Sequence, residues 1–198
     1  DLNNVIIYRD IRRMIFMRVI TGVARGRRLS TLEGLDTRPT SQRNKEALFS
    51  VIQFDVEGRK VLDLFAGSGQ LGIEALSRGA SSAVFVDSSK KAAAVVKKNL
   101  EATGFLNKAQ VHCREWKTYI SSARESFNLV FLDPPYGKDI LHDAIPLSAK
   151  ALEKGGVIVC EHDASDKLPE SFEGLELFRR KAYGRTVFSF YRKEQEIT

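Results

Sequence analysis

The chain of 198 residues is 43% hydrophobic and 28% charged, with a formal net charge of +6. This length suits one domain of ordinary size, with room for a small appendage. No apolar run approaches the roughly 18 residues that a membrane-spanning helix needs, and the N-terminus lacks the layout of a secretory signal. These features argue against a membrane or secreted protein, and we expect a soluble, cytoplasmic one.

The positive charge is concentrated near the N-terminus. Between Arg9 and Lys45, ten Lys and Arg residues oppose three acidic ones, so this block carries +7 and the rest of the chain −1. Such segregation favours a polyanionic partner. A solvated basic face without a ligand would have the same composition and is the alternative.

At the start of the chain, residues 1–16 contain no clear turn signal. We interpret them as an N-terminal extension that is disordered or foreign to the native chain. Residues 17–55 form a basic appendage. An alternating run with two glycines predicts a short β-hairpin between Met17 and Leu29. Apolar residues at helical spacing after Pro39 then predict a helix that ends near Ile52.

Residues 56–194 are predicted to form the main domain, in which strand and helix patterns alternate. The expected strands are 61–64, 83–86, 109–112, 129–132 and 157–160, and the expected helices centre on 71–76, 90–103, 116–122 and 141–152. Short apolar strands joined by helices imply right-handed crossovers and a parallel sheet covered on both faces.

The tail departs from this alternation. It is predicted to form two strands, 175–183 and 186–191, around a Gly184-Arg185 turn that leaves no room for a helix. We therefore predict a doubly wound α/β fold with a mixed seven-stranded sheet whose last strand is antiparallel.

The first predicted strand leads into a glycine-rich turn. Gly67, Gly69 and Gly72 have the spacing of a dinucleotide-binding turn, and Asp87 lies twenty residues past Gly67. Ligands of doubly wound sheets bind where strands end, so a nucleotide-like ligand is the leading interpretation and a purely structural turn the alternative.

The acid before these glycines argues against NAD. Asp63 would repel a pyrophosphate and attract a cation, and no segment supplies a recognisable hydride-transfer pocket. S-adenosylmethionine fits better, because its ammonium group needs one acid and its ribose a second. Asp63 and Asp87 meet those two needs.

The motif Asp133-Pro134-Pro135-Tyr136 directly follows the fourth predicted strand and so opens onto the same edge of the sheet. The prolines stiffen the backbone and leave carbonyl groups that only accept hydrogen bonds. A carboxylate, a carbonyl and an aromatic ring suit an exocyclic amino group on a flat heterocycle. The alternative for Asp133 is a helix cap.

These motifs together resemble the RsmD family, bacterial methyltransferases that act on a guanine N2 of 16S ribosomal RNA. The resemblance rests on DLFAGSGQLGIEALSRGA, VFVD and DPPY with the upstream MRVITGVARGRRL and RPTSQRNKEALFSVI, and runs from about Met17 to Lys193. It implies a Rossmann-like class I methyltransferase fold with S-adenosylmethionine as cofactor and no metal. The expected partner is 16S rRNA, within a small ribosomal subunit or an assembly intermediate, and the protein is expected to be a monomer.

The resemblance also implies roles for individual residues. Asp87 would take the ribose hydroxyls, and Glu115 stands near the adenine where relatives usually have Asp. Trp116 would pack beside the adenine or serve the core. Asn44 and Lys45 replace the usual Val-Arg, which weakens any specific role for position 45. The implied cofactor-binding set is Asp63, Phe65, Ala66, Gly67, Gly69, Asp87 and Glu115.

For the substrate, the resemblance implies that Asp133 and Pro134 accept the amino hydrogens and that Tyr136 stacks on an extruded base. Arginines of the basic block would contact the RNA backbone and lend affinity rather than base choice. They are Arg25, Arg27, Arg28, Arg38 and Arg43.

Two other functions stay open. A non-catalytic RNA-binding module would keep the fold without cofactor uptake, which the complete set of acids argues against. A DNA adenine-N6 methyltransferase would be expected to have a separate target-recognition domain, for which this chain has no room. Cys113 and Cys160 are interpreted as buried, reduced thiols without a catalytic role.

Overall fold

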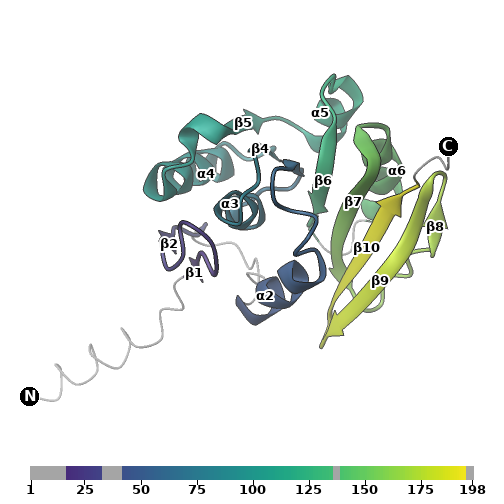
Figure 1. Cartoon of the computed structure of the whole chain (residues 1–198). Helices are drawn as coiled ribbons and strands as arrows, with labels where there is room; N and C mark the ends of the chain where they lie inside the picture. Colours follow the sequence, from purple (N-terminus) through teal and green to yellow (C-terminus); the bar gives the residue numbers. More distant parts are fainter. Residues whose placement is uncertain (1–16, 33–41, 136–138, 195–198) are drawn as a thin grey trace, which may run out of the picture.

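Within residues 17–32, 42–135 and 139–194, which the computed structural model describes, an eight-stranded sheet has the order β5-β4-β3-β6-β7-β10-β9-β8 (Figure 1). The five strands from β5 to β7 in this order are parallel, and β10 is antiparallel to both its neighbours, β7 and β9. The strands are β3 (Lys60–Asp63), β4 (Ser82–Asp87), β5 (Ala109–Cys113), β6 (Phe127–Leu132), β7 (Leu152–Asp163), β8 (Ser171–Phe172), β9 (Leu175–Tyr183) and β10 (Thr186–Lys193).

The predicted doubly wound α/β fold is confirmed, with one correction to the strand count. The described residues form a sheet of eight strands, not the predicted seven, because Ser171 and Phe172 pair with the start of β9. A strand of two residues is too short to produce an alternating pattern in the sequence. The antiparallel hairpin predicted for the tail is present as β9 and β10.

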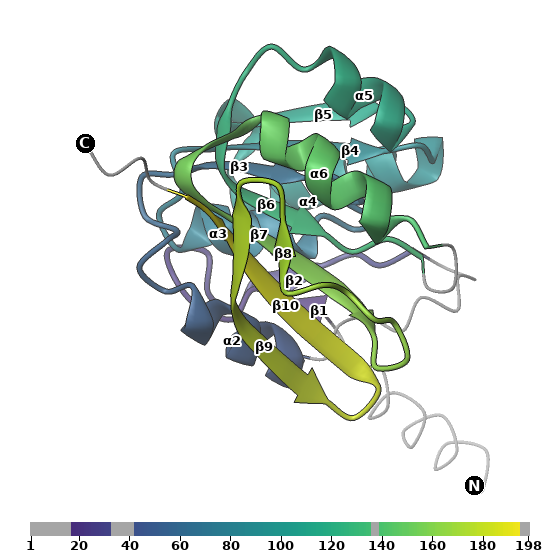
Figure 2. The ribbon, with the colours of Figure 1, turned by 90° about the vertical axis from the view of Figure 1, so that its right-hand side faces the viewer.

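Helices cover both faces of the sheet. On one face, α2, α3, α4 and the N-terminal hairpin share a core with β3, β4, β6, β7 and β10. On the other, α5 and α6 pack against alternate residues of the same parallel strands. Figure 2 shows these two helices lying on that face of the sheet. The helices are α2 (Gln42–Val51), α3 (Gln70–Ser77), α4 (Lys90–Thr103), the 3-10 helix η1 (Leu106–Lys108), α5 (Trp116–Ser122) and α6 (Leu141–Lys150).

The predicted N-terminal hairpin is present but short. Its strands, β1 (Met17–Arg18) and β2 (Arg28–Leu29), form two residue pairs. The intervening loop turns back to α3, where the N–H groups of Val23 and Ala24 donate to the backbone and side-chain oxygens of Ser77 at 2.9 and 3.0 Å. The hairpin therefore lies on the first helix of the main domain, beside α4 (Figure 1).

The glycine turn explains how β3 passes into α3. Gly69 precedes the helix with a φ of 77°, a conformation that glycine adopts without strain. A Cβ atom at Gly72 would lie 2.3 Å from the ring of Phe85 on β4. The third glycine of the turn therefore allows α3 to pack closely on the sheet.

The two cysteines differ in exposure. Cys160 on β7 is buried, and burial raises the pKa of its thiol above the ordinary value. The expectation that Cys113 is also buried is wrong, because Cys113 ends the edge strand β5 and is exposed. Within the described ranges, no helix combines the length and apolar character needed to cross a bilayer.

Candidate active site

Asp63 ends β3 directly before the glycine turn. Its side chain is buried, and one carboxylate oxygen accepts a hydrogen bond of 3.1 Å from the N–H of Gly72 in the first turn of α3. Burial raises the pKa of Asp63 to about 7; the charge of Asp87 adds to this, and the Gly72 N–H opposes it. A buried carboxylate with a raised pKa is a site that a bound cation would stabilise.

Asp87 ends the neighbouring strand β4 and is half-buried. Its two carboxylate oxygens accept hydrogen bonds from the N–H groups of Gly67, at 2.9 Å, and Ser89, at 2.8 Å. These bonds fix the carboxylate beside the glycine turn, and each oxygen keeps capacity for a further donor such as a hydroxyl. The structure thus brings Asp63, Asp87, Gly67 and Gly72 together at one edge of the sheet.

The remaining residues of the predicted cofactor site differ in burial and in the contacts that they make. Phe65 packs against Trp116 with ring centroids 5.7 Å apart, and Ala66 is buried beside the turn. Glu115 is exposed, and its side chain caps α5 by accepting a 2.7 Å hydrogen bond from the N–H of Lys117. The observed contact of Glu115 is therefore structural, and a contact with adenine stays a prediction.

Asp133 and Pro134 follow β6, the other neighbour of β3. Burial, then the charges of Glu161 and Asp63, raise the pKa of Asp133 well above its ordinary value. Acidic side chains from three adjacent strands therefore converge. Tyr136 lies outside the described residues.

A pocket of about 290 Å³ adjoins this loop, lined in part by Pro134, Pro135, Ile140, Leu141, Glu161 and Leu168. Glu161 was not predicted as a site residue from the sequence, although a signal was present. Glu161 directly follows the apolar residues of the fifth predicted strand, a position like those of Asp87 and Asp133.

The predicted RNA-binding arginines lie on the surface where they are described. Arg25, Arg27 and Arg28 are exposed in the hairpin, and Arg43 is exposed near the start of α2. Arg38 lies outside the described residues. The hairpin and α2 share the face of the sheet that carries α3, so these arginines lie on the same side as the helix that follows the glycine turn.

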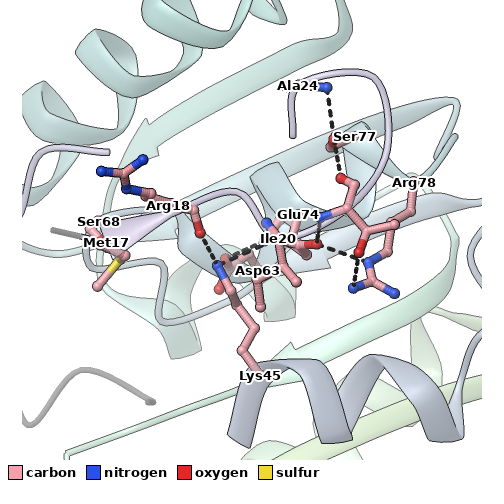
Figure 3. Close-up of polar contacts among 12 residues, drawn as sticks. Met17, Arg18, Ile20, Ala24, Lys45, Asp63, Ser68, Glu74, Ser77 and Arg78 are labelled. Carbon is pink, nitrogen blue, oxygen red and sulfur yellow. Dashed lines mark hydrogen bonds and ion pairs between the residues drawn. The ribbon is translucent and has the colours of Figure 1, made fainter. Parts of the chain in front are cut away.

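A buried carboxylate joins the hairpin to that helix. Glu74 of α3 is completely buried. One of its oxygens accepts from the N–H of Ile20 at 2.8 Å, and the other accepts from the N–H of Thr21 at 3.0 Å and from Nε of Arg78 at 2.9 Å. Together with the contacts of Ser77, Glu74 therefore binds the loop of the hairpin to α3 (Figure 3).

Lys45 completes this cluster from α2. It is also completely buried, its Nζ lies 3.3 Å from a carboxylate oxygen of Glu74, and it donates a 2.9 Å hydrogen bond to the carbonyl of Arg18 (Figure 3). Burial lowers the pKa of Lys45, and the charge of Glu74 opposes that shift. Lys45 therefore connects α2, α3 and the hairpin, a structural role that the resemblance to the family did not indicate.

A Rossmann-like sheet with a glycine turn, acids at the ends of adjacent strands and an Asp-Pro-Pro loop is typical of the class of methyltransferases. The family model described as "Conserved hypothetical protein 95" matches residues 17–192. This match and the relatives below show that the chain belongs to the RsmD family, as its motifs predicted.

Three relatives illustrate the likeness. "Putative rRNA methyltransferase YlbH" of Bacillus subtilis is 42% identical, covering 89% of this chain and 99% of that protein. "Ribosomal RNA small subunit methyltransferase D" of Escherichia coli K12 is 32% identical, covering 91% of each. The solved structure of the protein yhhF from Escherichia coli matches with a TM-score of 0.81 at 33% identity, covering 90% of this chain and 98% of that one.

The ion pair between Lys45 and Glu74 predicts a large effect of one substitution on stability. Lys45→Met should lower the free energy of unfolding by about 3 kcal/mol, because it leaves a buried carboxylate with less compensation. Urea denaturation measures this. The matched control is Lys117→Met, which removes the exposed pair with Asp143 and should cost less than about 1 kcal/mol. Equal losses in the two variants would contradict a stabilising role for the buried pair.

Proposed function

We propose that the protein transfers a methyl group from S-adenosylmethionine to the exocyclic N2 amino group of a guanine in 16S ribosomal RNA. The observation that carries the proposal is the convergence of Asp63 and Asp133 at the ends of adjacent strands, where the charge of the first raises the pKa of the second. The Escherichia coli relative named for small-subunit rRNA methylation supports the choice of substrate.

The residues at the glycine turn fit the chemistry of the cofactor. Asp63 would hold the methionyl ammonium, and the first N–H groups of α3 would face the carboxylate. Asp87, whose oxygens are already oriented by two backbone N–H groups, would accept the ribose hydroxyls. Phe65, Ala66, Gly67 and Gly69 would line the methionyl side, and Glu115 would lie near the adenine. When bound, the cofactor supplies an electrophilic methyl group on a sulfonium.

The Asp-Pro-Pro loop would prepare the nucleophile. The N2 lone pair of guanine is delocalised into the ring, so the nitrogen must become pyramidal before it attacks. The Asp133 carboxylate and the Pro134 carbonyl, by accepting the two N2 hydrogens, favour that geometry. Tyr136 would hold the base by stacking.

The cofactor held at the glycine turn would supply the methyl carbon. The bond from this carbon to N2 would replace its bond to sulfur, the electron pair of the broken bond would stay on sulfur, and one N2 proton would be released. Asp133 takes that proton. Its raised pKa makes it a stronger base than an ordinary carboxylate.

Residues 17–55 would serve as the RNA-binding appendage, acting through Arg25, Arg27, Arg28, Arg38 and Arg43. We propose that the monomeric protein acts in the cytoplasm on a small ribosomal subunit or an assembly intermediate.

Activity is tested with methyl-labelled S-adenosylmethionine and naked 16S rRNA, small ribosomal subunits or DNA as acceptors. The expected product, identified by mass spectrometry of nucleosides, is labelled N2-methylguanosine from RNA. Asp133→Ala should lower kcat by about a hundredfold or more while cofactor affinity is kept. Label in N6-methyladenine of DNA would contradict the proposed substrate, and wild-type turnover by Asp133→Ala would contradict the role of Asp133.

The pKa of Asp63 predicts a pH dependence of cofactor binding. The charged carboxylate binds the ammonium, so below pH 7 binding must release the proton held at a pKa of about 7. Affinity for S-adenosylmethionine should therefore rise with pH between about pH 5 and 7, by up to tenfold per unit. Calorimetric titration of Asp63→Asn, which keeps the size of the side chain, should give weaker and pH-independent binding over this range. A sloping profile in Asp63→Asn would assign the titration to another group.

The hairpin arginines predict a salt-dependent contribution to RNA binding. The double variant Arg27→Glu/Arg28→Glu should weaken affinity more than tenfold at low salt and reduce the slope of log K against log salt by roughly two. Arg124→Glu/Lys150→Glu makes the same change of charge at a distant pocket lined by both residues and should have a smaller effect. Filter binding across salt concentrations distinguishes the two outcomes, and equal effects would mean that only net charge matters.

A further inference from the structure

A buried glutamate faces the Asp-Pro-Pro loop from the neighbouring strand. Phe131 of β6 pairs with Val159 of β7, and both belong to the same core cluster. Glu161, two residues further along β7, therefore lies on the same face of the sheet as Val159, and Asp133 comes just past the end of β6 at the same level. Glu161 is only 5% exposed.

The backbone around Glu161 is held firmly in the sheet. Glu161 pairs with Phe188 of β10. The next residue, His162, forms a 2.9 Å hydrogen bond through Nε2 with the hydroxyl of Ser189. A carboxylate on a paired strand, rather than on a loop, can hold a ligand atom in one position.

Glu161 and Pro134 line the same pocket of about 290 Å³, close to the lower size of small-molecule sites, about 300 Å³. The influence of Glu161 on the pKa of Asp133 indicates that the two carboxylates are close. A group bound between two carboxylates must offer hydrogens to both of them, because a second acceptor would be repelled.

Guanine presents that arrangement on its Watson–Crick edge. Its N1 carries a hydrogen directly beside the N2 amino group, so the edge offers adjacent donors. Adenine and 2-aminopurine have a lone pair at N1, which an ionised carboxylate would repel. Methyl transfer to N2 uses the amino hydrogens at Asp133 and Pro134, and the N1 hydrogen is left for another acceptor.

We propose that Glu161 accepts the N1–H of the target guanine and thereby selects guanine over other aminopurines. This inference rests on the proposed function. It assigns base selection to β7, whereas the Asp-Pro-Pro loop acts on the amino group. Glu161 is therefore a specificity-determining residue of the same site.

The wild-type protein provides the first test. The guanine that it methylates is replaced, in the same RNA or reconstituted particle, by 2-aminopurine, which keeps the N2 amino group but has neither N1–H nor O6. We expect kcat/KM to fall by roughly tenfold or more, in the range of a lost base contact. Equal kcat/KM for the two bases would overturn the inference, and this result does not depend on the folding of any variant.

A variant provides the second test. Glu161→Gln replaces the carboxylate by an amide that can donate to the N1 lone pair of 2-aminopurine. The ratio of kcat/KM for guanine to that for 2-aminopurine should therefore fall by roughly tenfold or more. Glu170→Gln is the matched control, because Glu170 is exposed beyond the pocket, and it should leave the ratio unchanged.

The two tests separate the possible failures. A merely structural role of Glu161 would lower kcat/KM equally for both bases, and an unchanged ratio in Glu161→Gln would overturn the inference. If the wild-type protein methylates guanine N2, the proposed function stands whichever result the two tests of Glu161 give. No transfer to guanine by the wild-type protein would overturn both proposals.

Discussion

The buried carboxylate of Glu74 is the interaction on which the arrangement of the molecule depends. An ionised group is retained inside a protein only when opposite charges and hydrogen bonds compensate for the loss of water. Lys45, Arg78 and two N–H groups of the hairpin loop provide this compensation. Because these partners come from separate parts of the chain, Glu74 determines where the hairpin and α2 lie relative to the glycine turn.

A second constraint follows from the parallel order of β3, β6 and β7. Parallel strands end at the same edge, so acids near or just past their C-terminal ends are brought close to one another. Burial, together with the charges of Glu161 and Asp63, raises the pKa of Asp133. The same side chains become favourable partners when a cation and hydrogen-bond donors are bound between them. The protein therefore holds acids close together, at an electrostatic cost, at the edge of the sheet where we propose that methyl transfer occurs.

Much of this arrangement could be predicted from the sequence because the signals are local. The apolar strands, the glycine turn and the Asp-Pro-Pro motif are all contiguous, and the structure confirms the secondary structure around them. β8 was missed because two residues form no pattern. The pair between Lys45 and Glu74 was missed because its partners are far apart in the sequence, and a lysine on a helix is normally solvated.

Two other differences between prediction and structure have different physical causes. Glu115 caps its own helix, a use of a carboxylate that the resemblance to a family did not indicate. Glu161 has a strong local signal, an acid directly after a run of apolar residues, but its importance emerges only when the strand order places β7 beside β6. Which acids meet is a property of the topology, and the chain order alone does not reveal it.

The unequal exposure of the two thiols makes the native chain suitable for selective labelling. Cys113 is exposed on the edge strand, and in the register of β4 and β5 it lies opposite Asp87. Cys160 is buried, and its raised pKa keeps it protonated and unreactive. A maleimide fluorophore should therefore attach at Cys113 without any engineered cysteine, next to the carboxylate proposed to hold the ribose. Such a dye would report occupancy of that position in solution and in real time.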